Sequence, residues 1–231
     1  MQGKDIKDKL KTLISQASSI EPCLAKRLDE INRWLKDVKP GTLTAKKFVT
    51  AFLLQIIKHS TVWLTLKALP SQEEQQSALE LMTPTERYWY NYLFPEWLNE
   101  NDPKFYIWKQ KLMTGEFNQA DAEIIKSMAE NIVSRGGTVW QCYVADLSMA
   151  TDLIVSSRQK KPLCVQITRV AEEFSQQKYQ NWERTLGRWK IKRGLFLSYN
   201  PGLPHFMNQL VNVALYNSDN LPLGNYLKFP R

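Results

Sequence analysis

The first half of the chain carries its apolar residues at helical spacing. One stripe with a spacing of three or four residues consists of Leu24, Leu28, Ile31 and Leu35. The stretch 48–66 has a wider apolar face, which predicts the central buried helix of this half. Further along, Thr83-Pro84-Thr85-Glu86 is typical of a helix start, because Thr83 can cap, proline suits the first turn and Glu86 closes a capping box.

From about residue 117 the pattern alternates between helical and extended segments. Helices are expected at 120–134, 172–190 and 205–216. Short runs rich in Val, Ile, Trp and Tyr predict strands at 138–145, 151–156, 163–169 and 194–199, with a last extended piece at 226–229. The polar turn 158–162 predicts that the second and third strands form a hairpin.

These elements predict an α+β protein in two parts. Residues 1–116 are expected to form an all-helical domain, because strand-like runs are nearly absent there. Residues 117–231 are expected to form an α/β domain with a mixed sheet. Its elements follow the order helix, three strands, helix, strand, helix.

Composition favours a cytoplasmic protein. The cysteines of the 231-residue chain are Cys23, Cys142 and Cys164, and their wide spacing predicts neither a disulfide framework nor a zinc module. Two histidines in all argue against a Ser-His-Asp or Cys-His enzyme. Polar residues interrupt the stretch 48–66, and the N-terminus has no apolar secretory segment, so neither a membrane span nor a signal peptide is expected.

Three polar residues stand out in the strands of the second half. Asp152 opens the apolar second strand, where an unpaired buried carboxylate is costly. Strand alternation puts Gln166 and Thr168 on one face of the third strand. A hairpin of this size can therefore bring the three side chains together. For an isolated Asp and Gln, a turn cap and a solvent-facing strand residue are the more usual roles.

The order of elements resembles the restriction-endonuclease-like, or PD-(D/E)XK, nuclease superfamily over about residues 120–200. In that superfamily a helix carries a Glu, the second strand carries an Asp, and the third carries an acid-x-Lys motif. Here Asp152 looks like the aspartate, Gln166-Ile167-Thr168 looks like acid-x-Lys, and Glu130 (or Glu123, two turns earlier) looks like the helical acid. The resemblance implies a restriction-endonuclease-like core and a Mg²⁺ or Mn²⁺ site of Asp152, Glu130 and Gln166.

Two positions depart from the superfamily pattern. Gln166 replaces an acid, so a metal would be held more weakly and Mn²⁺ would be favoured over Mg²⁺. Thr168 replaces the lysine that stabilises charge or activates the attacking water. Lys178, on the following helix, could reach the site in its place. An active domain would hydrolyse phosphodiesters as an endonuclease with Asp152, Gln166, Thr168, Glu130 and Lys178 as its catalytic residues.

The positive charge of the chain is concentrated in one segment. The net charge is +8, and residues 157–193 contribute +7 of it, with ten Lys and Arg against three Glu. Basic groups interleaved with Tyr179, Trp182 and Trp189 suit phosphate contacts combined with base stacking, although at least one of the tryptophans is expected in the core. The residues expected to bind nucleic acid are Arg158, Lys160, Lys161, Lys178, Arg184, Arg188, Lys192 and Arg193.

Our leading hypothesis from the sequence is a nucleic-acid-binding protein with a degenerate nuclease-like domain, for DNA rather than RNA. Two alternatives stay open. One is an active nuclease that depends on a divalent metal, and the other is a non-enzymatic scaffold or assembly subunit that makes protein contacts. Nuclease-like domains often pair, so a homodimer or larger assembly is a further expectation. Salt-sensitive binding to nucleic acid separates the first two hypotheses from the third.

Overall fold

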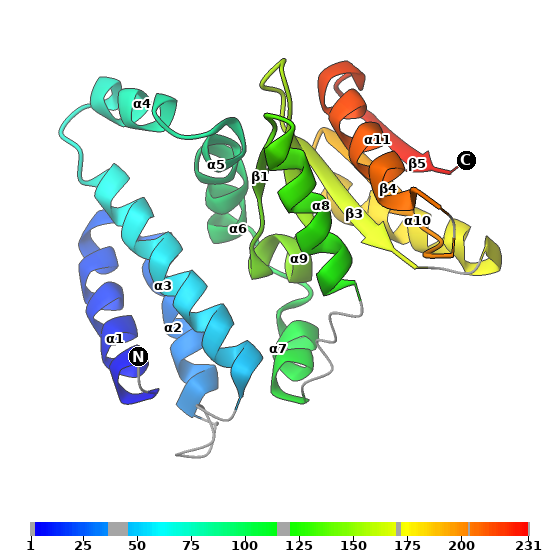
Figure 1. Ribbon diagram of the computed structural model, residues 1–231. Coiled ribbons are helices and arrows are strands. Elements are labelled where there is room, and N and C mark those ends of the chain that lie inside the picture. The colour runs from blue at the N-terminus through cyan, green and yellow to red at the C-terminus, as the bar shows by residue number, and fades with distance from the viewer. Residues whose placement is uncertain (1–2, 37–45, 115–120, 170–171, 203, 231) are drawn as a thin grey trace. The chain divides into compact units, whose positions relative to one another are not determined.

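The computed structural model describes residues 3–36, 46–114, 121–169, 172–202 and 204–230. They form an α+β protein with N-terminal helices and a mixed sheet (Figure 1). The chain divides into two compact units, Met1–Leu81 with Phe94–Asn118 and Met82–Leu93 with Gln119–Arg231. The expected boundary at 116/117 falls outside the described residues. The segment Met82–Leu93 belongs to the second unit and not to the helical one.

The described part of the first unit consists of helices joined by loops. They are α1 (Gly3–Ile20), α2 (Pro22–Lys36), α3 (Lys47–Lys67), α4 (Gln72–Glu80), α6 (Phe94–Asn99) and α7 (Phe105–Thr114). Helix α1 packs against both α2 and α3. The predicted stripe of α2 is fully buried, and so are Val49, Phe52 and Leu53 of α3. The predictions of an apolar stripe and of a buried helix at 48–66 are therefore confirmed.

Helix α3 is the one element in the described residues that is long and apolar enough to cross a bilayer, judged by length and composition. In this structure 56% of its apolar window is buried inside the protein. Core helices of water-soluble proteins pass the same test, so the observation is weak evidence for a membrane. The expectation of no membrane span stays a prediction.

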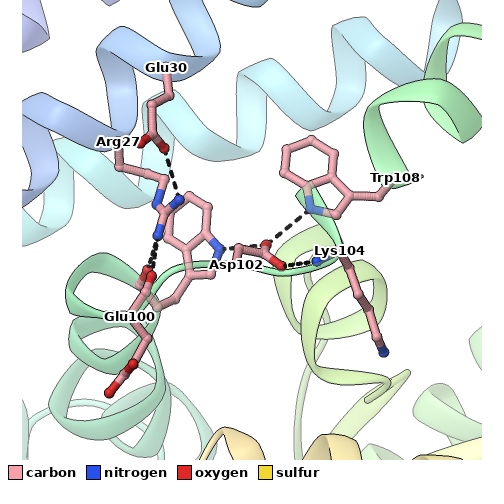
Figure 2. A network of polar contacts seen from close by, with 7 residues as sticks. Arg27, Glu30, Glu100, Asp102, Lys104 and Trp108 are labelled. Atoms are coloured by element: carbon pink, nitrogen blue, oxygen red, sulfur yellow. Dashed lines mark hydrogen bonds and ion pairs between the residues drawn. The ribbon is translucent and has the colours of Figure 1, made fainter. Parts of the chain in front are cut away.

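A buried arginine ties α2 to the loop that follows α6 (Figure 2). The Arg27 side chain donates to Glu30 Oε2 at 2.9 Å, to the Trp97 carbonyl at 2.8 Å and to the Glu100 carbonyl at 2.5 Å. Its guanidinium also lies over the Trp97 ring, 4.9 Å from the centroid. These contacts satisfy a cation that is only 5% exposed, which makes its role structural.

Asp102 is the second buried charge of this unit (Figure 2). Its Oδ2 accepts hydrogen bonds from Trp97 Nε1 at 3.3 Å and from Trp108 Nε1 at 3.0 Å. Its Oδ1 accepts the backbone N–H of Lys104 at 2.9 Å, which caps the turn leading into α7. One carboxylate therefore satisfies two indole groups and a backbone amide inside the helical unit.

The second unit contains the sheet. Its helical elements are α5 (Pro84–Tyr88), the π-helical turn η1 (Trp89–Leu93), α8 (Ala122–Ser134), α9 (Tyr143–Met149), α10 (Glu172–Arg188) and α11 (Phe206–Asn220). Its strands are β1 (Thr138–Trp140), β2 (Leu153–Ser156), β3 (Leu163–Thr168), β4 (Arg193–Ser198) and β5 (Asn225–Phe229). The capping box of Thr83 and Glu86 at the start of α5 is present as predicted.

The strands lie in the order β1-β2-β3-β4-β5. Pairing is antiparallel from β1 to β3 and parallel from β3 to β5, so the sheet is mixed and β2–β3 is the predicted hairpin. Helices α8 and α11 cover one face of the sheet, where they form a core with Val165 and Leu195 (Figure 1). Helix α10 covers the other face, where Trp182 packs against Phe196 at a ring distance of 5.5 Å.

One predicted strand is wrong over most of its length. The run 138–145 forms strand β1 only as far as Trp140, and α9 begins at Tyr143. Cys142 caps this helix through its Sγ, which accepts the N–H of Ala145 at 3.5 Å. Short apolar runs fit a buried helix as well as a strand, and burial of Val144 and Met149 favours the helix here.

Candidate functional site

Two buried tryptophans, Trp182 of α10 and Trp189 immediately after that helix, hold the segment that leads into β2. Helix α9 ends at Met149 and is followed by Ala150, whose φ of 51° lies in the left-handed region. Trp189 Nε1 donates to the Ser148 carbonyl at 2.9 Å, and Trp182 Nε1 donates to the Ala150 carbonyl at 3.0 Å. The backbone immediately before Asp152 is therefore fixed by bonds to both indoles.

The Asp152 carboxylate lies inside the protein against β3, with a side chain that is 5% exposed. The backbone N–H of Asp152 donates to the Val165 carbonyl at 2.9 Å, which extends the pairing of β2 with β3. Oδ2 accepts hydrogen bonds from Gln166 Nε2 and from the backbone N–H of Ile167, each at 2.6 Å. The expectation that the hairpin brings Asp152 beside Gln166 is confirmed.

Thr168 and Lys178 meet at the carboxyl end of β3. Thr168 is the last residue of that strand and is buried. Lys178 comes from α10, is an exposed residue, and donates from Nζ to Thr168 Oγ1 in a partly buried hydrogen bond. Lys178 therefore reaches the strand end at which the resemblance implies a lysine, as its position on the following helix suggested.

Glu130 lies away from Asp152, on the solvent face of α8. Its side chain is 66% exposed, and its Oε1 is 3.9 Å from Lys126 Nζ. Glu123 is exposed as well. Glu123 is two residues before Ile125, and Glu130 is two residues after Met128, and both of these apolar residues face the core. Two residues correspond to about 200° around a helix, so both glutamates lie on the opposite side of α8. The exposure of Glu130 gives no support to the expected convergence with Asp152 and Gln166, which stays a prediction.

Two aspartates that the sequence did not single out, Asp121 and Asp146, act electrostatically on the Asp152 carboxyl group. Asp121 precedes α8 and accepts a hydrogen bond from the Tyr199 hydroxyl through Oδ1. Asp146 lies on α9. Asp121 stands four residues before Ile125, so it continues the buried stripe of α8, and that spacing could have identified it. Asp146 fell in a segment expected to be a strand, so the sequence held no comparable signal for it.

The electrostatic environment favours the protonated form of Asp152. Burial raises the pKa of this carboxyl well above its usual range, and the negative charge of Asp146 raises it further. The charge of Asp121 acts in the same direction, whereas the Ile167 N–H and the Lys178 ammonium lower the pKa. At the same edge of the sheet, burial and the bond to Asp121 raise the pKa of Tyr199 to about 12.

The donor set does not fit a divalent metal. Mg²⁺ and Mn²⁺ prefer several oxygen ligands, among them ionised carboxylates. Among the described residues, no group of three or more His, Cys, Asp or Glu side chains is placed to hold an ion. Oδ2 of Asp152 already accepts two N–H groups, and Glu130 points to solvent. No cleavage step through a metal follows from this geometry.

Comparison with known proteins was made along three lines. No family model, curated protein or solved structure matches this chain. The function is therefore inferred from the contacts, burial and charge of the residues themselves.

The expected nucleic-acid-binding residues lie in three places in the second unit. Lys178 is beside the Asp152 site. Arg184 and Arg188 are exposed, one turn apart, on the side of α10 opposite the buried Trp182 and Leu186. The remaining exposed cations surround the β2–β3 turn and the start of β4, and they are Arg158, Lys160, Lys161 and Lys192.

Arg193 is buried, and its expected role in binding phosphate is wrong. Its guanidinium donates to four backbone carbonyls, and Arg193 is only 5% exposed. Burial lowers its pKa from the usual value, as expected for a cation removed from water. Four of the five N–H donors of this buried group are therefore used inside the protein, so it is poorly placed to bind a phosphate on the surface.

Trp182 of α10 and Trp189, which directly follows that helix, are also part of the core. Trp182 is 3% exposed and Trp189 is fully buried, which confirms that at least one tryptophan packs inside. Both indole N–H groups are used by backbone carbonyls. Stacking of bases on these two rings is therefore not available, and Tyr179 is the partly exposed aromatic residue that remains on α10 among the described residues.

Proposed function

We propose that the protein binds nucleic acid through its second unit, whose core is a degenerate restriction-endonuclease-like domain. The observation that carries this proposal is the exposed basic side of α10. Arg184 and Arg188 face solvent there, and Lys178 lies toward the start of the same helix. Guanidinium groups make paired hydrogen bonds to phosphate oxygens, so this arrangement favours a backbone-contacting surface.

The spacing of these cations suits a phosphate backbone. Ten residues separate Lys178 from Arg188, which corresponds to about 15 Å along a helix. Phosphates of one strand follow each other at about 3.4 Å along the axis of a DNA duplex. A backbone lying along α10 would therefore pass several phosphates between Arg188 and the Asp152 site.

Several features favour binding over cleavage. Thr168 stands where an active domain would carry its lysine, and Asp152 is buried with a raised pKa. The sequence order is α8, β1, α9, β2, β3, α10 and β4, so apart from the inserted α9 it agrees with the nuclease-like interpretation of the core. The preference for DNA over RNA rests on the resemblance to restriction-endonuclease-like proteins.

The binding proposal is tested by titrating labelled single- and double-stranded DNA and RNA over a range of salt concentrations. Affinity should fall steeply with salt, with a logarithmic slope near −0.9 for each phosphate contacted in duplex DNA. The double variant Arg184→Glu/Arg188→Glu should weaken binding roughly tenfold or more and reduce that slope by about two. Lys4→Glu/Lys9→Glu is the matched control, because it makes the same charge change on the exposed side of α1.

Two results would contradict the proposal. One is the absence of salt-sensitive binding to any of the four nucleic acids, which would favour the scaffold hypothesis. The other is an equal loss of binding in the α1 control, which would indicate a non-specific effect of net charge.

A separate incubation with Mg²⁺ or Mn²⁺ tests whether the domain has lost cleavage. We expect the labelled strands to remain intact, because the ligand set around Asp152 does not fit a metal. Cleavage by the wild type that disappears in Asp152→Asn would show instead that the active-nuclease alternative is correct. Cleavage that persists in Asp152→Asn would point to a contaminant.

A further inference from the structure

A cavity of about 540 Å³ lies wholly within the second unit, away from Asp152. Its volume falls in the range of roughly 300–1,000 Å³ that is usual for small-molecule sites. The lining comes from α5, η1, the β2–β3 turn, the start of β4 and the segment that follows α11. The residues that carry the chemistry are Tyr88, Tyr92, Lys160, Lys161, Lys192 and Asp219.

The cavity and the Asp152 site lie at opposite ends of the same strand. Pro162, which lines the cavity, precedes the first residue of β3, whereas Thr168 is the last residue of that strand. A strand of six residues is about 17–20 Å long. A ligand in the cavity therefore does not touch Asp152, Gln166 or Lys178.

Arg193 holds the walls of the cavity together. Its guanidinium donates to the carbonyls of Leu221 at 2.8 Å, Pro162 at 3.1 Å, Asn217 at 2.9 Å and Ser218 at 2.6 Å. These carbonyls belong to the β2–β3 turn, to the end of α11 and to the segment after it. One buried cation thus joins three segments of the lining, and the cavity is preformed.

Three further bonds fix the remaining walls. The Tyr92 hydroxyl donates to the Lys190 carbonyl at 2.7 Å, which ties η1 to the approach of β4. Asp219 Oδ1 accepts the N–H of Gln159 at 2.8 Å, which holds the turn that carries Lys160 and Lys161. Gly224 donates its N–H to the Lys192 carbonyl at 2.7 Å.

The lining combines an aromatic and apolar wall with cations. The rings of Tyr88 and Tyr92 stack at a centroid distance of 5.4 Å and an angle of 18°. Leu221, Pro222 and Leu223 supply apolar surface, and Leu223 is 76% exposed. Such a wall suits the flat face of an aromatic ring.

The cations of the cavity lack a matching set of acids. Lys160, Lys161 and Lys192 make no ion pair with any other described residue, and Asp219 is the single acid among the lining residues. Like charges held close together repel one another, so an anion placed among the three ammonium groups relieves that repulsion. Phosphate satisfies several lysines at once, because it offers several acceptor oxygens.

We infer that this cavity is a binding site for a small aromatic phosphate of the mononucleotide class. The ring stacks along the Tyr88–Tyr92 wall and the apolar segment, and the phosphate lies among Lys160, Lys161 and Lys192. The site is separate from the nucleic-acid surface on α10, so it does not depend on that proposed function.

Isothermal titration calorimetry of the 231-residue protein tests this inference with four probes. Adenosine monophosphate and phenyl phosphate carry both a ring and a phosphate, whereas adenosine and inorganic phosphate carry one of the two. We expect saturable binding of one equivalent of the first pair at submillimolar concentration. The second pair should bind at least about tenfold more weakly, because each lacks half of the contacts.

Two matched double variants locate the site. Lys160→Glu/Lys192→Glu should weaken binding of adenosine monophosphate by roughly tenfold or more, since it places acids where the phosphate lies. Arg184→Glu/Arg188→Glu makes the same change in net charge on α10 and should leave this affinity unchanged. All four side chains are exposed, so both variants should fold, which near-ultraviolet circular dichroism checks.

The inference fails if none of the four probes binds saturably, or if inorganic phosphate binds as tightly as adenosine monophosphate. It also fails if the arginine variant loses nucleotide binding while the lysine variant keeps it, because the nucleotide would then occupy the α10 surface. Loss of nucleic-acid binding in the arginine variant alone leaves the cavity in place, so the two proposals can fail separately.

Discussion

At the scale of single residues, burial decides what the polar side chains of this protein do. Arg184 and Arg193 are both arginines of the basic segment, yet one is exposed on a helix and the other is bonded to four carbonyls in the interior. His59 and His205 differ in the same way, because His59 is 2% exposed and His205 lies at the surface. Residue type alone does not distinguish the members of either pair.

The buried histidine predicts a pH-dependent stability. Burial, and to a lesser degree the charge of Lys58, lowers the pKa of His59 from 6.5 to about 3. The unfolded chain therefore binds a proton that the folded chain does not, between pH 6.5 and pH 3. The free energy of unfolding should fall by up to about 1.4 kcal/mol for each pH unit below 6.5.

Urea unfolding between pH 7 and pH 5 measures this slope before most carboxyl groups titrate. His59→Gln should remove most of the dependence, whereas His205→Asn, at the exposed histidine, should keep it. An unchanged slope in His59→Gln would contradict the assignment.

The carboxylate of Asp102 predicts a large loss of stability on truncation. Asp102→Ala leaves the indole N–H groups of Trp97 and Trp108 and the amide of Lys104 without their acceptor. The free energy of unfolding should fall by about 2–4 kcal/mol, because one buried donor left unsatisfied usually costs about 1–3 kcal/mol and this change leaves three. Chemical denaturation measures this loss of stability. The control is Asp8→Ala, at an exposed position of α1, which should change the free energy of unfolding by less than about 0.5 kcal/mol. A loss equal to that of the control would show that the network is dispensable.

At the scale of elements, α10 has a buried side and an exposed side that differ in their chemistry. Its buried side carries Trp182 and Leu186, and Trp182, together with Trp189 just after the helix, holds the backbone before Asp152. Its exposed side carries Arg184 and Arg188. Close packing against β4 is possible because position 194 is glycine. A Cβ there would lie 2.4 Å from Leu186 Cδ1 and 2.7 Å from Trp182 Cη2.

Two glycine substitutions in this region should therefore have opposite effects. Gly194→Ala should destabilise the protein by about 1–3 kcal/mol, because the added methyl overpacks a buried tryptophan. Gly187→Ala, within α10, meets nothing within 4 Å and should stabilise by about 0.5–1 kcal/mol through helix propensity. Thermal unfolding followed by circular dichroism compares them. Similar shifts of both variants in one direction would contradict the packing of α10 on β4.

At the scale of the whole molecule, charge is divided unevenly along the chain. Residues 157–193 hold +7 of the net +8, so the rest of the chain is close to neutral. Charge that is concentrated in this way attracts anionic partners to the second unit. The helical unit carries buried ion networks instead, around Arg27 and Asp102.

Lysine footprinting of the intact protein tests this division. When nucleic acid is bound, Lys178 and Lys190, which flank the two exposed arginines, should lose most of their reactivity toward an acylating reagent. Lys4, Lys9 and Lys11 of α1 should react as they do without nucleic acid. Mass spectrometry of the labelled peptides measures both groups, and protection spread evenly over the chain would contradict a single binding surface.

Local pattern determined much of this protein by itself. The stripe on α2, the β2–β3 hairpin, the meeting of Asp152 with Gln166 and the concentration of charge in 157–193 all follow from residues close in sequence. Helical and strand periodicity, turn composition and alternation act over a few residues, so they can be read without the fold.

Only the tertiary structure decided which of these residues meet. The rotation of α8 about its axis places Glu130 in solvent, whereas Asp121, just before this helix, acts on Asp152. Helix α9 replaces most of an expected strand, and it carries Asp146, whose charge also acts on Asp152. Arg193 became a buried clamp, and a cavity formed from segments as far apart as Tyr88 and Leu223. Each outcome depends on contacts between distant segments, and burial in those contacts sets the environment that gives a polar side chain its role.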